Sequence, residues 1–134
     1  MATYGGGITF ANVQSSNQTG SSGTIVMYVV PNPGNYYGLF KPLSLTSIGG
    51  TLSADVDVIV QNANGIGGWV NAYTAFHHPS STPILANNSV SISPTGANTD
   101  GYLALAVGQR VVLVTNVFAG TARLSFSYYE YSPS

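Results

Sequence analysis

Between residues 51 and 60, apolar residues occupy every second position, in the order Leu52, Ala54, Val56, Val58 and Val60. Successive side chains of a β-strand point to opposite faces, so this period of two predicts a strand with one buried face. A helix would need a period near 3.6, and no window between Thr24 and Tyr131 keeps that period. The pattern therefore restricts the chain to an all-β fold.

Similar short segments recur along the chain and are separated by Gly, Pro and Asn, which favour turns. The segment 102–107 fits either a short strand or a turn of helix. The last two segments are separated by a tight turn and predict a β-hairpin. Pro42 restricts its strand to a sheet edge or to a bulge. The predicted strands, about eight, are 24–30, 39–45, 51–60, 69–76, 89–93, 102–107, 110–118 and 122–131.

These strands predict an antiparallel β-sandwich of jelly-roll type, with a small β-barrel as the alternative. We expect a single sandwich domain over residues 24–134. Residues 1–23 contain a Gly-rich start and a Ser/Asn/Gln/Thr tract, and predict a flexible N-terminal arm, although a short strand there is left open. The expected core includes Val56, Val58, Val112, Val114, Leu124 and Phe126.

Charge is scarce, because only seven of the 134 residues are Lys, Arg, Asp or Glu. An average soluble domain has roughly 25% charged residues. A surface of neutral polar groups produces little long-range repulsion between copies of the protein. The composition therefore favours a homo-oligomer, whose contacts would be neutral side chains and backbone groups.

Several function classes are excluded by what the chain lacks. Its three cations are far apart in sequence, whereas phosphate binding needs a cluster of Lys and Arg, so no nucleic-acid partner is expected. No apolar stretch reaches 18 residues, so no membrane partner is expected. The chain has no cysteine and only two adjacent histidines, His77 and His78, so we expect neither a metal site nor a cofactor.

Catalysis is not expected either. Asp55 and Asp57 would share one strand face at roughly 7 Å, a spacing compatible with a hydrolytic pair or a Ca²⁺ site. Their face is polar, however, and solvated charges are the simpler explanation. No Gly-x-Ser-x-Gly motif is present. We therefore predict that the protein is not an enzyme.

Aromatic residues are the candidates for partner contacts, because rings with a polar tip suit both subunit interfaces and sugar stacking. The N-terminal segment adds apolar residues that could become ordered on binding. The selected positions are Tyr4, Ile8, Phe10, Val13, Tyr36, Tyr37, Trp69, Tyr129 and Tyr131.

Two strand pairs resemble those of small β-sandwich virion proteins of tailed bacteriophages. The segments Val29–Gly34 and Leu43–Leu45 are similar to their opening pair, and Leu105–Val114 with Ala119–Ala122 to their closing pair. The resemblance implies a capsid decoration (cement) protein, with a tail-fibre or spike module as the alternative. It also implies a trimer, the major capsid protein or another virion protein as partner, and location in the virion.

No secretory signal is visible in Met1–Phe10, so we expect synthesis in the host cytoplasm. The alternative from another class is a carbohydrate-binding module, with a glycan bound to exposed aromatic rings. The two functions predict different behaviour: a decoration protein is multimeric and binds shells, whereas a sugar module is monomeric and responds to glycans at Trp69.

Overall fold

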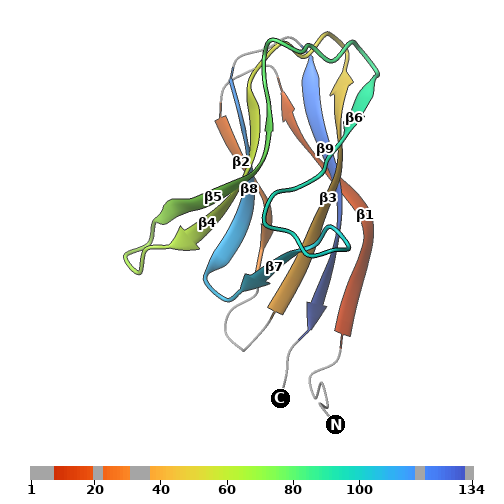
Figure 1. Ribbon diagram of the computed structural model, residues 1–134. Coiled ribbons are helices and arrows are strands. Elements are labelled where there is room, and N and C mark those ends of the chain that lie inside the picture. Colours follow the sequence, from red (N-terminus) through yellow and green to blue (C-terminus); the bar gives the residue numbers. More distant parts are fainter. Residues whose placement is uncertain (1–7, 20–22, 31–36, 117–119, 132–134) are drawn as a thin grey trace.

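Two antiparallel sheets face each other in the computed structural model, which describes residues 8–19, 23–30, 37–116 and 120–131 (Figure 1). The described residues form strands and turns but no helix, and hence no helix that could cross a membrane. The predicted all-β sandwich is therefore confirmed. The strands form two separate sheets, and not the closed barrel considered as the alternative.

The first sheet has the order β1 (Ile8–Thr19), β9 (Thr121–Tyr131), β3 (Tyr37–Ile48) and β6 (Ser89–Ser91). A fifth strand, β7 (Leu103–Ala106), pairs with the first part of β3, while β6 pairs with a later part. Because β9 occupies the opposite side of β3, β6 and β7 together fill a single strand position.

The second sheet has the order β2 (Gly23–Val29), β8 (Gln109–Thr115), β4 (Val56–Ala63) and β5 (Trp69–His78). With β6 and β7 counted as one position, the orders 1-9-3-6 and 2-8-4-5 are those of an eight-stranded jelly roll. The fold class predicted from the sequence is thus confirmed in its topology.

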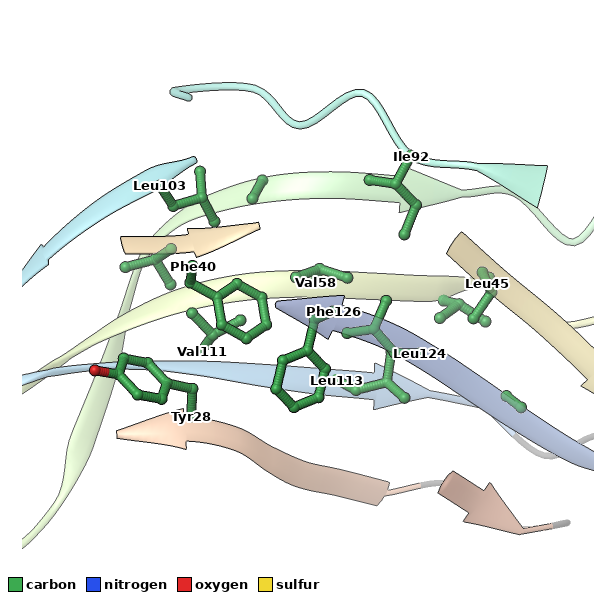
Figure 2. Close-up of a cluster of buried hydrophobic side chains, with 14 of the residues drawn as sticks. Tyr28, Phe40, Leu45, Val58, Ile92, Leu103, Val111, Leu113, Leu124 and Phe126 are labelled. Carbon is green, nitrogen blue, oxygen red and sulfur yellow. The ribbon is translucent and has the colours of Figure 1, made fainter. Parts of the chain in front are cut away.

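The predicted hairpin of the last two strands is wrong. β8 pairs with β2 and β4, whereas β9 pairs with β1 and β3, so the two strands belong to opposite sheets. Leu113 and Leu124 both enter the core, one from each sheet (Figure 2). A short connection can join two strands of one sheet as a hairpin or can carry the chain from one sheet to the other. The sequence pattern is the same in both cases, so it does not distinguish them.

β3 keeps Pro42 inside a central strand by means of a bulge. The register between β3 and β9 shifts between Pro42 and Ser44. On the other side of β3, pairing with β7 ends at Phe40 and pairing with β6 begins at Ser44. Proline has no N–H to donate to a ladder, and it lies where the ladder is interrupted. The predicted bulge is confirmed, within a central strand.

Residues 1–23 were predicted to be a flexible arm, but in the structure residues 8–19 form the strand β1. This strand pairs with β9 from Ile8↔Tyr131 to Thr19↔Thr121. A polar tract can form such a strand because ladder hydrogen bonds need no apolar side chain. Residue 23 therefore does not separate an arm from the sandwich. Residues 1–7 and 20–22 lie outside the described residues.

The strand predicted over residues 51–60 is correct in its faces but wrong in its start. All five apolar residues of the alternation are buried, yet β4 begins only at Val56. Leu52 instead forms an isolated bridge with Ile84. The buried side chains of both sheets meet in one core, whose largest members include Tyr28, Phe40, Leu45, Leu103, Val111, Leu113, Leu124 and Phe126 (Figure 2).

Among the six predicted core residues, five are buried and Val114 is not. Val111 and Leu113 of β8 face the core, so Val112 and Val114 lie on the outer face of the second sheet. Val112 is buried there by its neighbours on the sheet, whereas Val114 is partly exposed. The outer face of the second sheet is thus less polar than a regular alternation of buried apolar and exposed polar residues would make it.

Candidate functional site

Three of the nine predicted contact residues have described side chains, and they are not gathered at one place. Tyr37 lies at the start of β3 and is 46% exposed, Tyr129 lies on β9, and Trp69 begins β5 in the other sheet. The other six either lie outside the described residues or occupy β1 and β9 positions where only the strand is described. They are Tyr4, Tyr36, Ile8, Phe10, Val13 and Tyr131.

Tyr129 belongs to a small ring group on the first sheet. The rings of Tyr102 and Tyr129 have centroids 5.5 Å apart, and their hydroxyl groups are hydrogen-bonded. The ammonium group of Lys41 lies 5.4 Å from the centroid of Tyr102. The hydrogen bond to Tyr102 raises the pKa of Tyr129. This group holds the β6–β7 connection against the sheet, which is a structural role.

Trp69 is the centre of a connected polar cluster on the outer face of the second sheet. In β4, Val58 and Val60 enter the core, so Gln61 faces outward. Directly paired residues of antiparallel strands share a face, and Gln61 pairs with Arg110 of β8 and with Asn71 of β5. Three strands therefore bring these side chains together. We name Gln61, Trp69, Asn71 and Arg110 the Trp69 cluster.

Each member of the Trp69 cluster is held by the next. The guanidinium carbon of Arg110 lies 4.2 Å from the centroid of the Trp69 ring. The Nε–H group of Arg110 donates a hydrogen bond of 2.8 Å to Oε1 of Gln61. The amide nitrogen of Gln61 donates one of 2.9 Å to Oδ1 of Asn71. The cluster is therefore an ordered array across β8, β4 and β5.

The electrostatics of the cluster depend on Arg110. Partial burial beside the ring disfavours its charged form and lowers the pKa of the guanidinium from its ordinary value. The group remains a cation at physiological pH, because arginine starts from about 12.5 or above. Its two partners, a ring and an amide oxygen, are neutral. The cluster thus presents one positive charge among uncharged hydrogen-bonding groups.

An apolar row lies beside the cluster on the same face. Val112 pairs with Val26 of β2 on one side and with Ile59 of β4 on the other. Val112 and Ile59 are buried, whereas Val26 is 42% exposed. The next row along the sheet contains Asp57 and His77, whose Oδ1 and Nδ1 atoms are 2.6 Å apart. The outer face therefore combines a polar cluster, an apolar row and a hydrogen-bonded Asp57–His77 pair.

The acids and histidines considered for catalysis or metal binding do not converge. Oδ1 of Asp55 accepts a hydrogen bond from the backbone N–H of Ser80, and Asp57 pairs with exposed His77. His78 points the other way, into the protein, where its Nε2 lies 2.6 Å from the carbonyl oxygen of Thr82. In the part of the chain that the structure describes, no group of three His, Cys, Asp or Glu residues could hold a metal ion.

The β4–β5 hairpin that carries Trp69 projects from the sandwich (Figure 1). Two hydrogen bonds of 2.9 Å hold its tip, in which Oδ1 of Asn64 accepts from the backbone N–H groups of Ile66 and Gly68. The turn needs positive φ angles at Gly65 and Gly67, 82° and 88°. The ordered tip fixes the position of Trp69, which follows it directly.

Trp69 was selected from the sequence, but its three partners were missed. They lie 2 to 41 positions away, and only strand pairing brings them together. One usable signal was present. Gln61 follows buried Val60 and Arg110 precedes buried Val111, which places both polar side chains on the outer face. The register between strands, which makes them neighbours, cannot be obtained from the alternation alone.

No protein-family model and no curated protein matches the chain. Among solved structures, one similar chain comes from Bacillus endospore appendages, described as a family of disulfide-linked pili. It has 14% sequence identity and a TM-score of 0.46, over 95% of this chain and 89% of that chain. A second, PirA, has 13% identity and a TM-score of 0.35, over 89% of this chain and 92% of its own. Both TM-scores are below 0.5.

Proposed function

We propose that this protein is a structural subunit that works inside a protein assembly. The observation that carries the proposal is the composition of β1. This strand is the longest edge strand of the sandwich, with 12 residues, and among the described strands it is hydrogen-bonded only to β9. It contains no charged residue and no proline.

Natural proteins protect an exposed sheet edge with charges, prolines or bulges, because its free N–H and C=O groups would otherwise pair with another chain. β1 has only one such feature, a register shift between Ala11 and Gln14. The edge strand β5 is better protected, since the N–H group of Thr95 donates a 2.7 Å hydrogen bond to the carbonyl oxygen of Ala75. The β1 edge therefore suits addition of a strand from a second copy of this protein.

The scarcity of charge supports the same proposal, since seven charged residues in 134 give little repulsion between copies. The resemblance to small virion proteins of tailed bacteriophages supports its specific form: a trimeric decoration protein that binds and stabilises a capsid shell and is located in the virion. A tail-fibre or spike module is the alternative form. Neither form involves catalysis.

Sedimentation of the full chain tests the general proposal. We expect an oligomer that persists at about 1 M salt, where the screening length falls to about 3 Å and charge pairs at the surface are weakened. Lysines in β1 at positions paired with Ser125 and Arg123, and not with core Leu124 and Phe126, in the variant Ser15→Lys/Asn17→Lys, would place unpaired charge in the contact and should release monomers. Ser53→Lys, in an exposed segment outside the strands, is the matched control and should leave the oligomer intact.

A monomeric parent protein, or an equal effect of all lysine substitutions, would contradict the proposal. The specific form has its own test, in which the protein is mixed with capsid shells of a tailed phage that encodes it. We expect co-sedimentation with the shells and a higher temperature of genome release. Oligomers that never bind shells would leave a structural subunit but exclude the decoration function.

A further inference from the structure

We propose that the Trp69 cluster is a binding site for neutral carbohydrate. The site lies on the outer face of the second sheet, away from the β1 edge, and the inference goes beyond the structural function proposed above. It depends on the ring of Trp69, the donors of Arg110 and Asn71, and the fixed position of Gln61 between them.

The aromatic component suits a sugar ring. Sites for small ligands combine apolar surface with a few precisely placed polar groups. A pyranose has C–H groups on its faces, which pack on an aromatic ring, and hydroxyl groups around its edge. Trp69 is partly exposed and begins β5, directly after the tip of the projecting hairpin. The guanidinium of Arg110 lies over one face of the indole, 4.2 Å from the ring centroid, so a sugar ring would stack on the other face.

The hydrogen-bonding component suits hydroxyl groups. A guanidinium has five N–H donors, and the described hydrogen bond to Gln61 uses only the Nε–H group. The exposed Asn71 accepts from Gln61 through Oδ1, which leaves its NH₂ group as a donor. Sugar hydroxyls both accept and donate, so adjacent hydroxyls can satisfy these donors and the remaining lone pairs of the amide oxygens.

Preorganisation makes the array effective. Each polar side chain of the cluster is already held by its neighbour, so little rotamer entropy is lost when a ligand binds. In the adjacent row Val112 and Ile59 are buried and only Val26, at 42% exposure, is open to a ligand. The binding surface is therefore the Trp69 cluster itself.

Charge selects a neutral ligand over a polyanion. Arg110 is the single Lys or Arg of the described second sheet, since Lys41 and Arg123 belong to β3 and β9 of the first sheet. Polyanion binding depends on several cations at one surface. On the same face, Asp57 adds a negative charge beside His77. These charges disfavour nucleic acids and sulfated glycans.

The test uses the full chain and a panel of soluble neutral hexasaccharides of glucose, N-acetylglucosamine and mannose. Trp69 is the sole tryptophan, so its fluorescence reports directly on the site. Titration up to about 10 mM detects affinities down to the millimolar range. We expect a saturable change in emission with at least one sugar, together with shifts of the NMR signals from the side-chain amides of Gln61 and Asn71.

Two variants and one control assign the binding to the cluster. By calorimetry, Trp69→Ala should abolish binding and Asn71→Ala should weaken it roughly tenfold, as the loss of one well-placed hydrogen bond does. Tyr37→Ala removes an exposed aromatic residue from the other sheet and should have no effect. The oligomeric state, measured for each variant, should be unchanged, which separates this site from the structural function.

Four results would overturn the inference. The first is the absence of a saturable response to every hexasaccharide. The second is binding that survives in Trp69→Ala and Asn71→Ala. The third is a loss of self-association in these variants, which would identify the face as a contact between copies of the protein. A stronger response to dextran sulfate than to neutral sugars would likewise contradict the choice of ligand.

Discussion

Replacement of Gly38 by alanine should destabilise the protein through a single contact with Tyr28. Gly38 is buried in β3, and a Cβ atom at this position would lie 2.7 Å from Cε2 and 2.9 Å from Cζ of Tyr28. Carbon atoms in favourable contact are about 3.5–4.0 Å apart. The Tyr28 ring therefore occupies the space that a methyl group would need.

Tyr28 is not free to move aside. Its ring centroid lies 4.9 Å from that of Tyr128 and 5.9 Å from that of Phe40. Its hydroxyl group donates a hydrogen bond of 3.0 Å to Oε2 of Glu130. Overpacking of a well-filled core costs about 1–3 kcal/mol. Reduced freedom of the unfolded chain returns about 0.4–1 kcal/mol for Gly→Ala, so we expect a net loss of about 1–2 kcal/mol.

Urea unfolding followed by circular dichroism measures this loss, and a double-mutant cycle assigns it. Tyr28→Leu keeps an apolar side chain but lacks the ring atoms that Gly38→Ala would contact. In this background Gly38→Ala should be neutral or slightly stabilising, which gives a coupling of about 1–3 kcal/mol. Equal destabilisation in both backgrounds, or an unchanged midpoint for Gly38→Ala in the parent protein, would refute the reasoning.

Three further predictions concern the fold. Burial, together with the hydrogen bond to Glu130, raises the pKa of Tyr28. Because unfolded tyrosine ionises near 10, the stability that neutral Tyr28 contributes should be complete below pH 10 and should fall above it. In urea unfolding measured across this pH range, Tyr28→Phe should reduce that fall. Val112→Asp should prevent folding and Val114→Asp should not, as judged by circular dichroism, because only Val112 is fully buried. Gly120→Ala should lower the melting temperature, because φ is +80° there and a Cβ atom would lie 2.6 Å from the carbonyl oxygen of Ile48.

The alternation of apolar residues was sufficient to predict the fold class and most of the core. It works because one buried face per strand is a local property, visible from Val56 to Val60 without knowledge of any partner. The start of that strand was wrong because Leu52 and Ala54 are buried by a bridge and by loop packing rather than by a regular ladder. Burial and strand pairing coincide only where the ladder continues.

The assignment of strands to sheets and the Trp69 cluster could not be predicted from the sequence, for one shared reason. Both depend on which strands are neighbours, and in a jelly roll strands that follow each other in the chain mostly lie in opposite sheets. The pairing of β8 with β4, which brings Arg110 to Gln61, joins residues 49 positions apart. For a related reason, the β1 segment was predicted as a flexible arm with a short strand left open, since its polar tract is stabilised by the backbone of β9, at the other end of the chain.

The two proposed surfaces together predict that assembly strengthens glycan binding without changing the site. β1 is an edge of the first sheet, and the Trp69 cluster belongs to β8, β4 and β5 of the second sheet. In Figure 1, β1 and the β4–β5 hairpin lie on opposite sides of the view. Addition of a strand at β1 would therefore leave every cluster accessible. Several weak sites on one particle can raise the overall affinity for a glycan-coated surface by about 10²–10⁴.

Surface plasmon resonance on an immobilised hexasaccharide measures this effect. The parent oligomer should dissociate far more slowly than the monomeric variant Ser15→Lys/Asn17→Lys. Both proteins should bind the soluble hexasaccharide with the same Kd, because the substitutions leave the cluster unchanged. Equal dissociation rates on the surface would show that the sites cannot engage together, and a weaker soluble affinity of the variant would show that the edge and the cluster are not independent.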